Sequence, residues 1–250
     1  MNLKKTKLSF IIPAHNEAAY IGRCLQSILA EIKLGQYNAE VIVINNTSTD
    51  KTRDIAQSFN DVKVVDEPRK GAVYARQTGF KVAVGDYIIS IDADSRIPAG
   101  WVQTALQEFA EQKTLVAASG PVEYYDASPA LNRAVRWFYI IGFGSYLVNR
   151  FVLQVGSILQ GGAFIVKRSA LEKIGHRYSA NFEFWGDDID LARRLCEIGD
   201  VKFTYKLKFA TSGRRVIAEG PIIMGTRYSM NALSATFLKK PYTKHYIDVR

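Results

Sequence analysis

The chain has 250 residues, 48% of them hydrophobic, and a formal net charge of +9 with a pI near 9.4. This length and apolar content predict a globular protein with a large core and exclude a disordered chain. The positive charge favours an anionic partner such as a nucleotide, a phospholipid surface or nucleic acid, without choosing among them.

The first seven residues are basic, and the apolar run that follows them is interrupted at once by Pro13, His15 and Glu17. This pattern predicts a first strand and not a signal peptide. Without a secretory signal, we expect the protein on the cytoplasmic side.

As far as residue 94 the chain alternates short apolar strands with amphipathic helices, the signature of a parallel α/β sheet. The predicted strands are 8–13, 41–45, 62–65 and 87–91, and the predicted helices are 18–32, 50–59 and 71–83. In such a sheet, ligands bind beyond the carboxyl ends of the strands. All four predicted strands are followed by polar residues, namely 15–17, 45–50, 66–70 and 92–94.

These polar strand ends predict a nucleotide-sized binding edge. The chain has neither the Gly-x-Gly-x-x-Gly loop of dinucleotide-binding proteins nor a Walker phosphate loop. A dinucleotide dehydrogenase and a P-loop enzyme are therefore disfavoured.

Asp92 and Asp94 follow an apolar, β-rich run and are one residue apart. Because a strand alternates its side chains, the two carboxylates point to the same side and need a cation, or groups that carry one. A simple turn in which aspartates cap the chain is the alternative for the tripeptide alone. The other polar strand ends favour a ligand site.

The second half begins with a predicted helix 98–112, with Pro98 in its first turn, and a predicted strand 114–125. Residues 127–171 contain no acidic residue and include two uncharged, aromatic-rich runs, 137–149 and 151–166. Each run is shorter than the roughly 20 residues of a spanning helix. The segment 131–160 is consistent with a basic surface that lies on a membrane or with packed core helices.

A strand is predicted at 163–166 and a helix at 189–198, opened by Gly186, Asp187 and Asp188. Carboxylates are favoured in a first helical turn, which is a purely structural explanation for this pair. However, Asp188 shares the apolar helix face, whereas Asp190 is expected to pair outward with Arg193 or Arg194. An inward-facing carboxylate at a pocket mouth is a candidate general base.

Five motifs, in this order, resemble the pattern of glycosyltransferase family 2 over roughly residues 8–215. They are 11–17 (IIPAHNE), 44–50 (INNTSTD), 71–79 with Ala75 and Arg76, 91–94 (IDAD) and 186–191 (GDDIDL). The resemblance implies an α/β GT-A fold: a Rossmann-like, mostly parallel sheet with flanking helices. It also implies one domain over 1–250, with a nucleotide-sugar-binding half at about 1–98 and an acceptor-binding half at about 99–250.

The implied reaction is an inverting transfer of a sugar from a nucleotide diphosphate sugar to a hydroxyl, assisted by Mg²⁺ or Mn²⁺, with UDP-sugars favoured and GDP-sugars the second choice. Asp188 would be the base, Asp94 would coordinate the metal, and Asp92 would lie near the ribose and metal. The remaining donor-side residues would be Pro13, Ala14, Glu17, Asn46, Lys70 and Arg76. On the acceptor side, the resemblance and the aromatic loop before the second acid pair indicate Gly161, Gly162, Trp185 and Asp187. Arg214 and Arg215 are candidate diphosphate contacts, although a solvated basic turn explains them equally well.

Two departures from the family pattern affect the prediction. Asn45 and Asn46 replace the frequent pair of acids. An amide can both donate and accept a hydrogen bond, so the replacement is compatible with recognition of the nucleobase but leaves the choice of donor open. The Gln-x-x-Arg-Trp motif of processive synthases is also lacking, which favours single transfer over polymer synthesis.

We therefore expect a glycosyltransferase at the inner membrane surface that acts on a glycan or lipid-linked acceptor in envelope polysaccharide or glycolipid assembly, with no nucleic acid partner. The rival hypotheses are a sugar-phosphate nucleotidyltransferase and a non-catalytic basic protein that binds nucleic acid or membranes. The first lacks the expected glycine-rich loop after the first strand, and the second lacks a recognition helix or zinc-ligand spacing.

Overall fold

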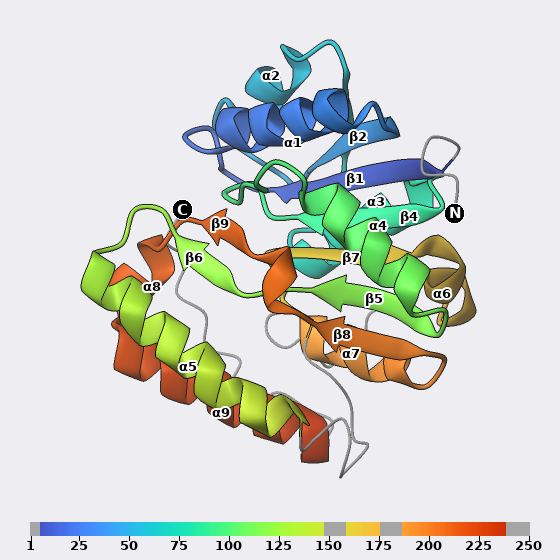
Figure 1. Cartoon of the computed structure of the whole chain (residues 1–250). Helices are drawn as coiled ribbons and strands as arrows, with labels where there is room; N and C mark the ends of the chain where they lie inside the picture. The colour runs from blue at the N-terminus through green and yellow to red at the C-terminus, as the bar shows by residue number, and fades with distance from the viewer. Residues whose placement is uncertain (1–5, 148–158, 176–186, 239–250) are drawn as a thin grey trace.

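The computed structural model describes residues 6–147, 159–175 and 187–238, and the fold is given for these residues (Figure 1). They contain a seven-stranded sheet in the order β3-β2-β1-β4-β7-β5-β8 and a two-stranded sheet, β6-β9. The strands are β1 Lys7–Ala14, β2 Asn38–Asn45, β3 Val62–Asp66, β4 Tyr87–Ile91, β5 Leu115–Ser119, β6 Val122–Tyr124, β7 Ala163–Lys167, β8 Asp200–Phe203 and β9 Phe209–Thr211. β7 runs antiparallel to β4 and β5, and the other neighbours in both sheets are parallel.

The helices of the described residues lie on both faces of the large sheet and beside the small one (Figure 1). Their bounds are α1 Ile21–Gly35, α2 Thr52–Gln57, α3 Ala72–Val82, α4 Trp101–Glu111, α5 Pro129–Leu147, α6 Arg168–Lys173, α7 Asp187–Cys196, α8 Arg214–Glu219 and α9 Pro221–Leu238, with a short 3₁₀ helix at Tyr205–Leu207. The strands and helices predicted up to residue 91 are confirmed, with boundaries that shift by a few residues.

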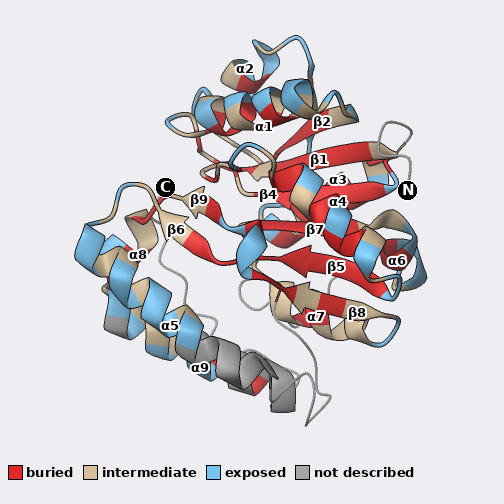
Figure 2. Ribbon diagram, viewed as in Figure 1, coloured by how far each residue is buried: buried red, intermediate tan, exposed pale blue. Residues whose placement is uncertain are grey.

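The large sheet separates two apolar cores because successive side chains of each strand point to opposite faces. In β2, Val41 and Val43 belong to the core beneath α1 and α4, whereas Ile42 and Ile44 belong to the core beneath α3 and α7. Strands buried on both faces appear as continuous apolar runs, as expected for a sheet covered by helices on both sides. Figure 2 shows the strands buried between helices with exposed outer faces.

The predicted strand 114–125 is wrong as a single element. It divides into β5 and β6, which belong to different sheets. Gly120 lies between them, where a Cβ atom would come within 2.3 Å of the Leu207 carbonyl oxygen. Pro121 lacks an amide hydrogen and accepts a hydrogen bond from the Phe209 amide through its carbonyl oxygen. The chain therefore changes sheets at these two residues.

The described part of the aromatic segment 131–160 forms most of α5, whereas residues 148–158 lie outside the described residues. The inner face of α5 packs through Val135 and Tyr139, and the Tyr139 ring stacks on Phe203 at 5.8 Å. Arg133, Arg136, Trp137, Phe138 and Ile140 of the same helix are exposed. Figure 2 shows much of the surface of α5 exposed. Residues 133–140 therefore form an amphipathic surface helix that packs on the core through one side, and both alternatives for the segment stay predictions. No helix within the described ranges is both long and apolar enough to span a bilayer.

Asp187 and Asp188 lie in the first turn of α7, as predicted, although the helix was expected at 189–198. The outward orientation predicted for Asp190 is wrong. Its side chain is only 1% exposed. Arg193 and Arg194 reach back over it with nitrogen–oxygen distances of 3.3 and 3.2 Å. Both predicted pairings are present because residues at i+3 and i+4 lie on the same helix face. The two arginines, which are themselves 30% and 18% exposed, cover the buried carboxylate.

Candidate active site

Polar residues that are far apart in sequence meet at one edge of the large sheet. Ala14, Asn45 and Asp66 end neighbouring parallel strands in register. Ile91 at the end of β4 pairs with Ala163 at the start of β7, because β7 is antiparallel. The edge therefore combines the carboxyl ends of β1 to β4 with the loop that precedes β7.

Arg76 on α3 joins the loops after β4, before β7 and at the start of α7. Its Nη2 atom donates to Asp92 Oδ1 at 2.8 Å and to the Gly161 carbonyl oxygen at 3.4 Å, while Nη1 pairs with Asp187. The Arg76 side chain is 8% exposed, whereas Asp92 is 38% exposed. Ligands in solution therefore reach the Asp92 carboxylate more readily than the guanidinium that holds it. The structure brings these four predicted site residues together.

Asp188 lies beside this cluster in the first turn of α7. A Cβ atom at Gly161 would come within 3.2 Å of Asp188 Oδ2 and within 3.7 Å of Arg76 Nη2, so glycine permits this close approach. Desolvation by burial, followed by repulsion from Asp187, raises the pKa of Asp188 to about 7. The Arg76 charge and hydrogen bonds from the Ile189 and Gly161 amides act in the opposite direction. Burial therefore outweighs the helix N-terminus and holds the pKa of Asp188 above the ordinary aspartate value.

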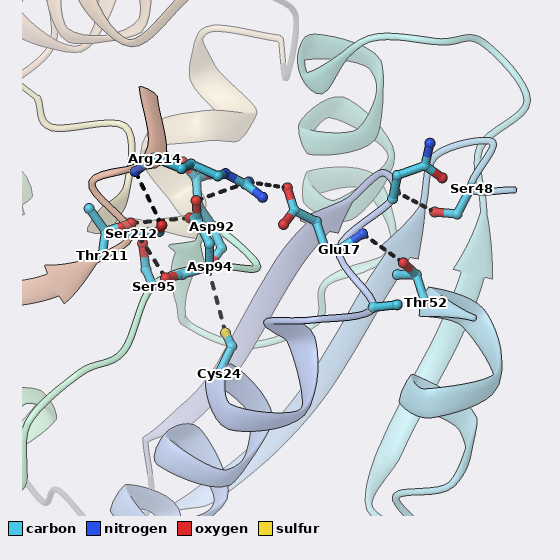
Figure 3. Close-up of polar contacts among 12 residues, drawn as sticks. Glu17, Cys24, Ser48, Thr52, Asp92, Asp94, Ser95, Thr211, Ser212 and Arg214 are labelled. Atoms are coloured by element: carbon cyan, nitrogen blue, oxygen red, sulfur yellow. Dashed lines mark hydrogen bonds and ion pairs between the residues drawn. The ribbon is translucent and has the colours of Figure 1, made fainter. Parts of the chain in front are cut away.

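Asp94 pairs with Arg214, which begins α8 and is distant in sequence. Arg214 Nη2 lies 3.0 Å from Asp94 Oδ2, and the same nitrogen donates to Glu17 Oε1 at 2.5 Å. Figure 3 shows the Arg214 side chain extended between these two carboxylates, one after β1 and the other after β4. The guanidinium also lies 4.7 Å from the centre of the Tyr20 ring. A single cation thus pairs with two predicted donor-side acids and offsets one of their two negative charges.

The segment before Arg214 is held to the Asp94 loop through its backbone. Arg96 and Ala210 exchange backbone hydrogen bonds of 2.7 and 2.9 Å. Thr211 donates its hydroxyl to Asp94 Oδ1 at 3.1 Å and accepts from the Ser95 hydroxyl at 2.9 Å (Figure 3). These contacts fix the Asp94 carboxylate so that Oδ1 faces Thr211 and Oδ2 faces Arg214.

Asn46 is buried and holds the loop after β3. Its side-chain nitrogen donates to the carbonyl oxygens of Glu67 and Arg69 at 3.0 and 2.7 Å, and its side-chain oxygen accepts from the Gly71 amide at 2.7 Å. An aspartate could not make the two donated bonds. Asn46 stands where the family usually has an acid, and the loop after β3 needs the hydrogen-bond donors that only the amide provides. The prediction that Asn46 contacts the donor base stays a prediction.

The remaining predicted residues occupy different places. Ala14 is buried and Pro13 is partly buried at the end of β1, and Gly162 accepts the Asp92 amide at 3.0 Å through its carbonyl oxygen. Lys70 is exposed on the loop after β3 and Arg215 is partly exposed on α8. Trp185 and the rest of the aromatic loop 181–186 lie outside the described residues.

The aspartates that follow β4 are suited to bind a divalent metal ion together with the phosphates of a substrate. Among the described residues, no group of three or more His, Cys, Asp or Glu side chains is placed to hold a metal ion by itself. Mg²⁺ commonly binds one or two carboxylates together with substrate phosphates and water. Asp94 fits this pattern, since its Oδ2 already faces a cationic group. Hard oxygen ligands of this kind suit Mg²⁺ or Mn²⁺.

Sequence reasoning missed Tyr20, Thr211 and Tyr125, although all three contact the Asp94–Arg214 group. Tyr125 donates its hydroxyl to the Asp94 carbonyl oxygen at 3.2 Å. Arg214 and Arg215 were candidates for the diphosphate, and Thr211, the last residue of β9, lies three residues before Arg214. Tyr20 and Tyr125 carry no local sequence signal, because their positions depend on how distant loops meet.

Comparison with known proteins gives consistent matches. The family model described as "Glycosyl transferase family 2" matches residues 9–175. The glycosyltransferase GlyG of Streptococcus pneumoniae is 28% identical over 168 residues, which are 65% of this chain and 53% of GlyG. The poly-beta-1,6-N-acetyl-D-glucosamine synthase of Staphylococcus epidermidis is 28% identical over 177 residues, 68% of this chain and 41% of the synthase. The chain thus spans about half the length of these relatives.

A solved structure of similar fold is the mannosyltransferase PcManGT of Pyrobaculum calidifontis, in complex with GDP-Man and Mn²⁺. The two share 23% identity with a TM-score of 0.66, and the match covers 94% of this chain and 64% of that one. At this identity the likeness shows the fold alone, and it confirms the predicted GT-A arrangement. Residues 187–188 and 214 lie beyond the region that the family model matches. Since that model covers most of the chain, the protein belongs to glycosyl transferase family 2.

Proposed function

We propose that the chain transfers a sugar, with inversion, from a nucleotide diphosphate sugar to a hydroxyl of a glycan or lipid-linked acceptor. The observation that carries this proposal is that Asp188, whose pKa is raised to about 7, lies at the same sheet edge as the two carboxylates that follow β4, the more exposed Asp92 and the largely covered Asp94. Family membership disfavours both the nucleotidyltransferase and the non-catalytic binding protein.

In this proposal Asp188 accepts the proton of the acceptor hydroxyl as its oxygen attacks C1 of the donor sugar. The bond between C1 and the diphosphate oxygen breaks on the opposite face, so the configuration at C1 inverts. A base with a pKa near the working pH combines an ionised fraction with sufficient basicity. Arg76 keeps Asp187 and Gly161 in place beside Asp188, and thus acts as an organiser of the base.

Negative charge develops on the leaving diphosphate as its bond to the sugar breaks. In the proposal, the diphosphate lies between the residues that follow β4 and those at the start of α8. Mg²⁺ or Mn²⁺ at Asp94, with Asp92 nearby, would neutralise that charge. Arg214, Arg215 and Lys70 are the basic side chains proposed for the diphosphate. Glu17, Pro13, Ala14 and the Asn46 loop would line the nucleoside, with UDP favoured over GDP.

A panel of nucleotide sugars tests the donor class. At a ligand concentration of 100 Kd, binding stabilises the folded state by about 2.7 kcal/mol. For a chain of this size we expect a melting temperature raised by about 5–10 °C. The measurement is thermal unfolding with UDP- and GDP-sugars, each with Mn²⁺ and with a chelator. No shift with any donor in the presence of Mn²⁺ would contradict the proposed function.

We also place the protein at an anionic membrane surface through the outer face of α5. Trp137 is 64% exposed there, Phe138 and Ile140 are each 48% exposed, and Arg133 and Arg136 are exposed on the same helix. Residues 127–171 contain no acid that would oppose anionic lipid. Aromatic side chains beside arginines suit the interface of such a bilayer.

Vesicle binding tests this placement. Burying one large apolar side chain contributes about 1.5–3 kcal/mol. The double variant Trp137→Ser, Phe138→Ser is therefore expected to bind vesicles containing phosphatidylglycerol more than about tenfold less tightly. Leu34→Ser is the matched control, because Leu34 is 65% exposed on α1. Equal sedimentation of both variants with the vesicles, or binding to neutral vesicles alone, would refute the placement.

A further inference from the structure

Arg214 occupies the place at Asp94 where a metal ion would be expected. Its Nη2 atom lies 3.0 Å from Asp94 Oδ2, and both side chains are largely covered, at 17% and 16% exposed. A divalent ion bound to the same oxygen would lie about 2.0–2.2 Å from it. Two cations at these distances from one oxygen repel each other strongly, more so in a partly buried site. The metal and the guanidinium therefore compete for Asp94.

The structure also provides a second partner for Arg214 when it leaves Asp94. Glu17 is 5% exposed, and its Oε1 atom contacts the same Nη2 nitrogen. A donor diphosphate would offer a further partner, since arginine binds phosphate oxygens in a bidentate manner. Because Glu17 keeps the side chain near the site, an exchange from Asp94 to the diphosphate needs only a change in the side-chain conformation.

The backbone contacts around Arg214 support a side-chain exchange over a movement of α8. Asp126 accepts hydrogen bonds from the Ser212 hydroxyl and the Gly213 amide, immediately before Arg214. The pairing of Arg96 with Ala210 holds the preceding strand. The start of α8 is thus anchored to the loop after β6 through Asp126 and to the segment after Asp94 through Arg96.

On these grounds we infer that Arg214 is a positioning residue that makes metal binding depend on the donor, by holding Asp94 until a diphosphate draws its guanidinium away. This inference rests on the proposed function. It predicts that free metal binds weakly, because it must displace Arg214 without compensation. Nucleotide diphosphate and metal should then strengthen each other's binding by the same factor, as linkage requires.

The test measures Mn²⁺ binding by electron paramagnetic resonance, with and without saturating UDP, and subtracts the binding of Mn²⁺ to UDP alone. We expect Arg214→Gln to bind Mn²⁺ about tenfold more tightly than the unmodified protein in the absence of UDP, and to show a smaller enhancement by UDP. Arg214→Lys should keep the weak binding of free Mn²⁺, because one ammonium nitrogen can still face Asp94. A role in folding alone would not separate the glutamine from the lysine variant.

Arg96→Gln is the matched control for loss of a positive charge near Asp94. Arg96 stacks on Tyr125, with its guanidinium carbon 3.9 Å from the ring centre. Its replacement should change the affinity for free Mn²⁺ much less than Arg214→Gln does. An equal gain in both variants would show that general charge, and not the Arg214 contact, controls the metal.

The outcomes separate the inference from the function. If the unmodified protein binds no Mn²⁺ even with UDP or GDP, the proposed metal-assisted function fails. If the unmodified protein binds Mn²⁺ and the nucleotide, but Arg214→Gln leaves the affinity for free Mn²⁺ unchanged, only the inference about Arg214 fails. If Arg214→Gln does not fold, the nuclear magnetic resonance signal of the Arg214 guanidinium in the unmodified protein is measured instead of the variant. That resonance is expected to shift when UDP and Mg²⁺ are added, and an unchanged resonance would overturn the exchange.

Discussion

Asp188→Asn is expected to lower turnover by on the order of 10² or more while leaving donor binding unchanged, as removal of a general base should. The amide fills nearly the same space but cannot accept the acceptor proton. Steady-state transfer to an acceptor gives the turnover, and the melting shift with the donor gives the binding. Near-normal turnover in this variant would remove Asp188 from the proposed role.

The pH dependence gives an independent readout of the same residue. Because the base works when ionised and the Asp188 pKa is raised to about 7, turnover should increase as pH rises through about 7. This increase forms the acidic limb of the plot of turnover against pH. Asp188→Asn should abolish this limb. Asp187→Asn is the informative partner variant, since it removes the neighbouring negative charge that raises the Asp188 pKa. It should shift the limb to lower pH without abolishing it.

Stability should change in the opposite direction to activity. The folded-state pKa of Asp188 lies above the ordinary aspartate value of 3.8, so ionisation is less favourable in the folded protein than in the unfolded chain. This contribution lowers the free energy of unfolding as pH rises from about 4 to about 7, and is constant above that range. Asp188→Asn removes the contribution and is expected to melt higher than the unmodified protein at pH 8. A variant that melts lower there would indicate structural damage and not the loss of a base.

Local sequence patterns predicted much of this fold because they depend on neighbours within the chain. The strands up to residue 91 are continuous apolar runs, and the polar residues after them lie at one edge as parallel topology requires. The division of 114–125 was also accessible, since Gly120 followed by Pro121 is a turn signal. The antiparallel insertion of β7 between β4 and β5 was not, because strand pairing across some 70 residues has no local signal.

The site shows the same division between local and distant information. Asp92, Asp94 and Asp188 became candidates from their positions after a strand and in a helix, whereas their partners came only from the structure. Arg76 was expected to meet the nucleotide, yet its described contacts are to Asp92, Asp187 and Gly161. The need of two neighbouring acids for cationic groups was predictable. The identity of those groups, Arg76 for Asp92 and Arg214 for Asp94, depended on long-range packing.

The second large effect is expected at Asp94. A metal at a developing diphosphate charge contributes several kcal/mol to the transition state, so Asp94→Asn should lower turnover by on the order of 10³. The same variant should lose the part of the donor-induced melting shift that requires Mn²⁺ and keep the part seen with a chelator. An asparagine oxygen is a weaker ligand for a hard cation than a carboxylate.

Asp92→Asn separates the two acids that follow β4. Asp92 is held by Arg76 and is proposed to face the ribose, so its replacement should weaken nucleotide binding both with Mn²⁺ and with a chelator. Asp94 instead has its Oδ2 atom facing the Arg214 cation, which marks it as the acid whose loss should act through the metal. If Asp94→Asn retained the full Mn²⁺-dependent shift while Asp92→Asn lost it, the division of roles would be reversed. Such a reversal would also undermine the proposed competition between Arg214 and the metal, because the contested carboxylate would no longer be the one that Arg214 holds.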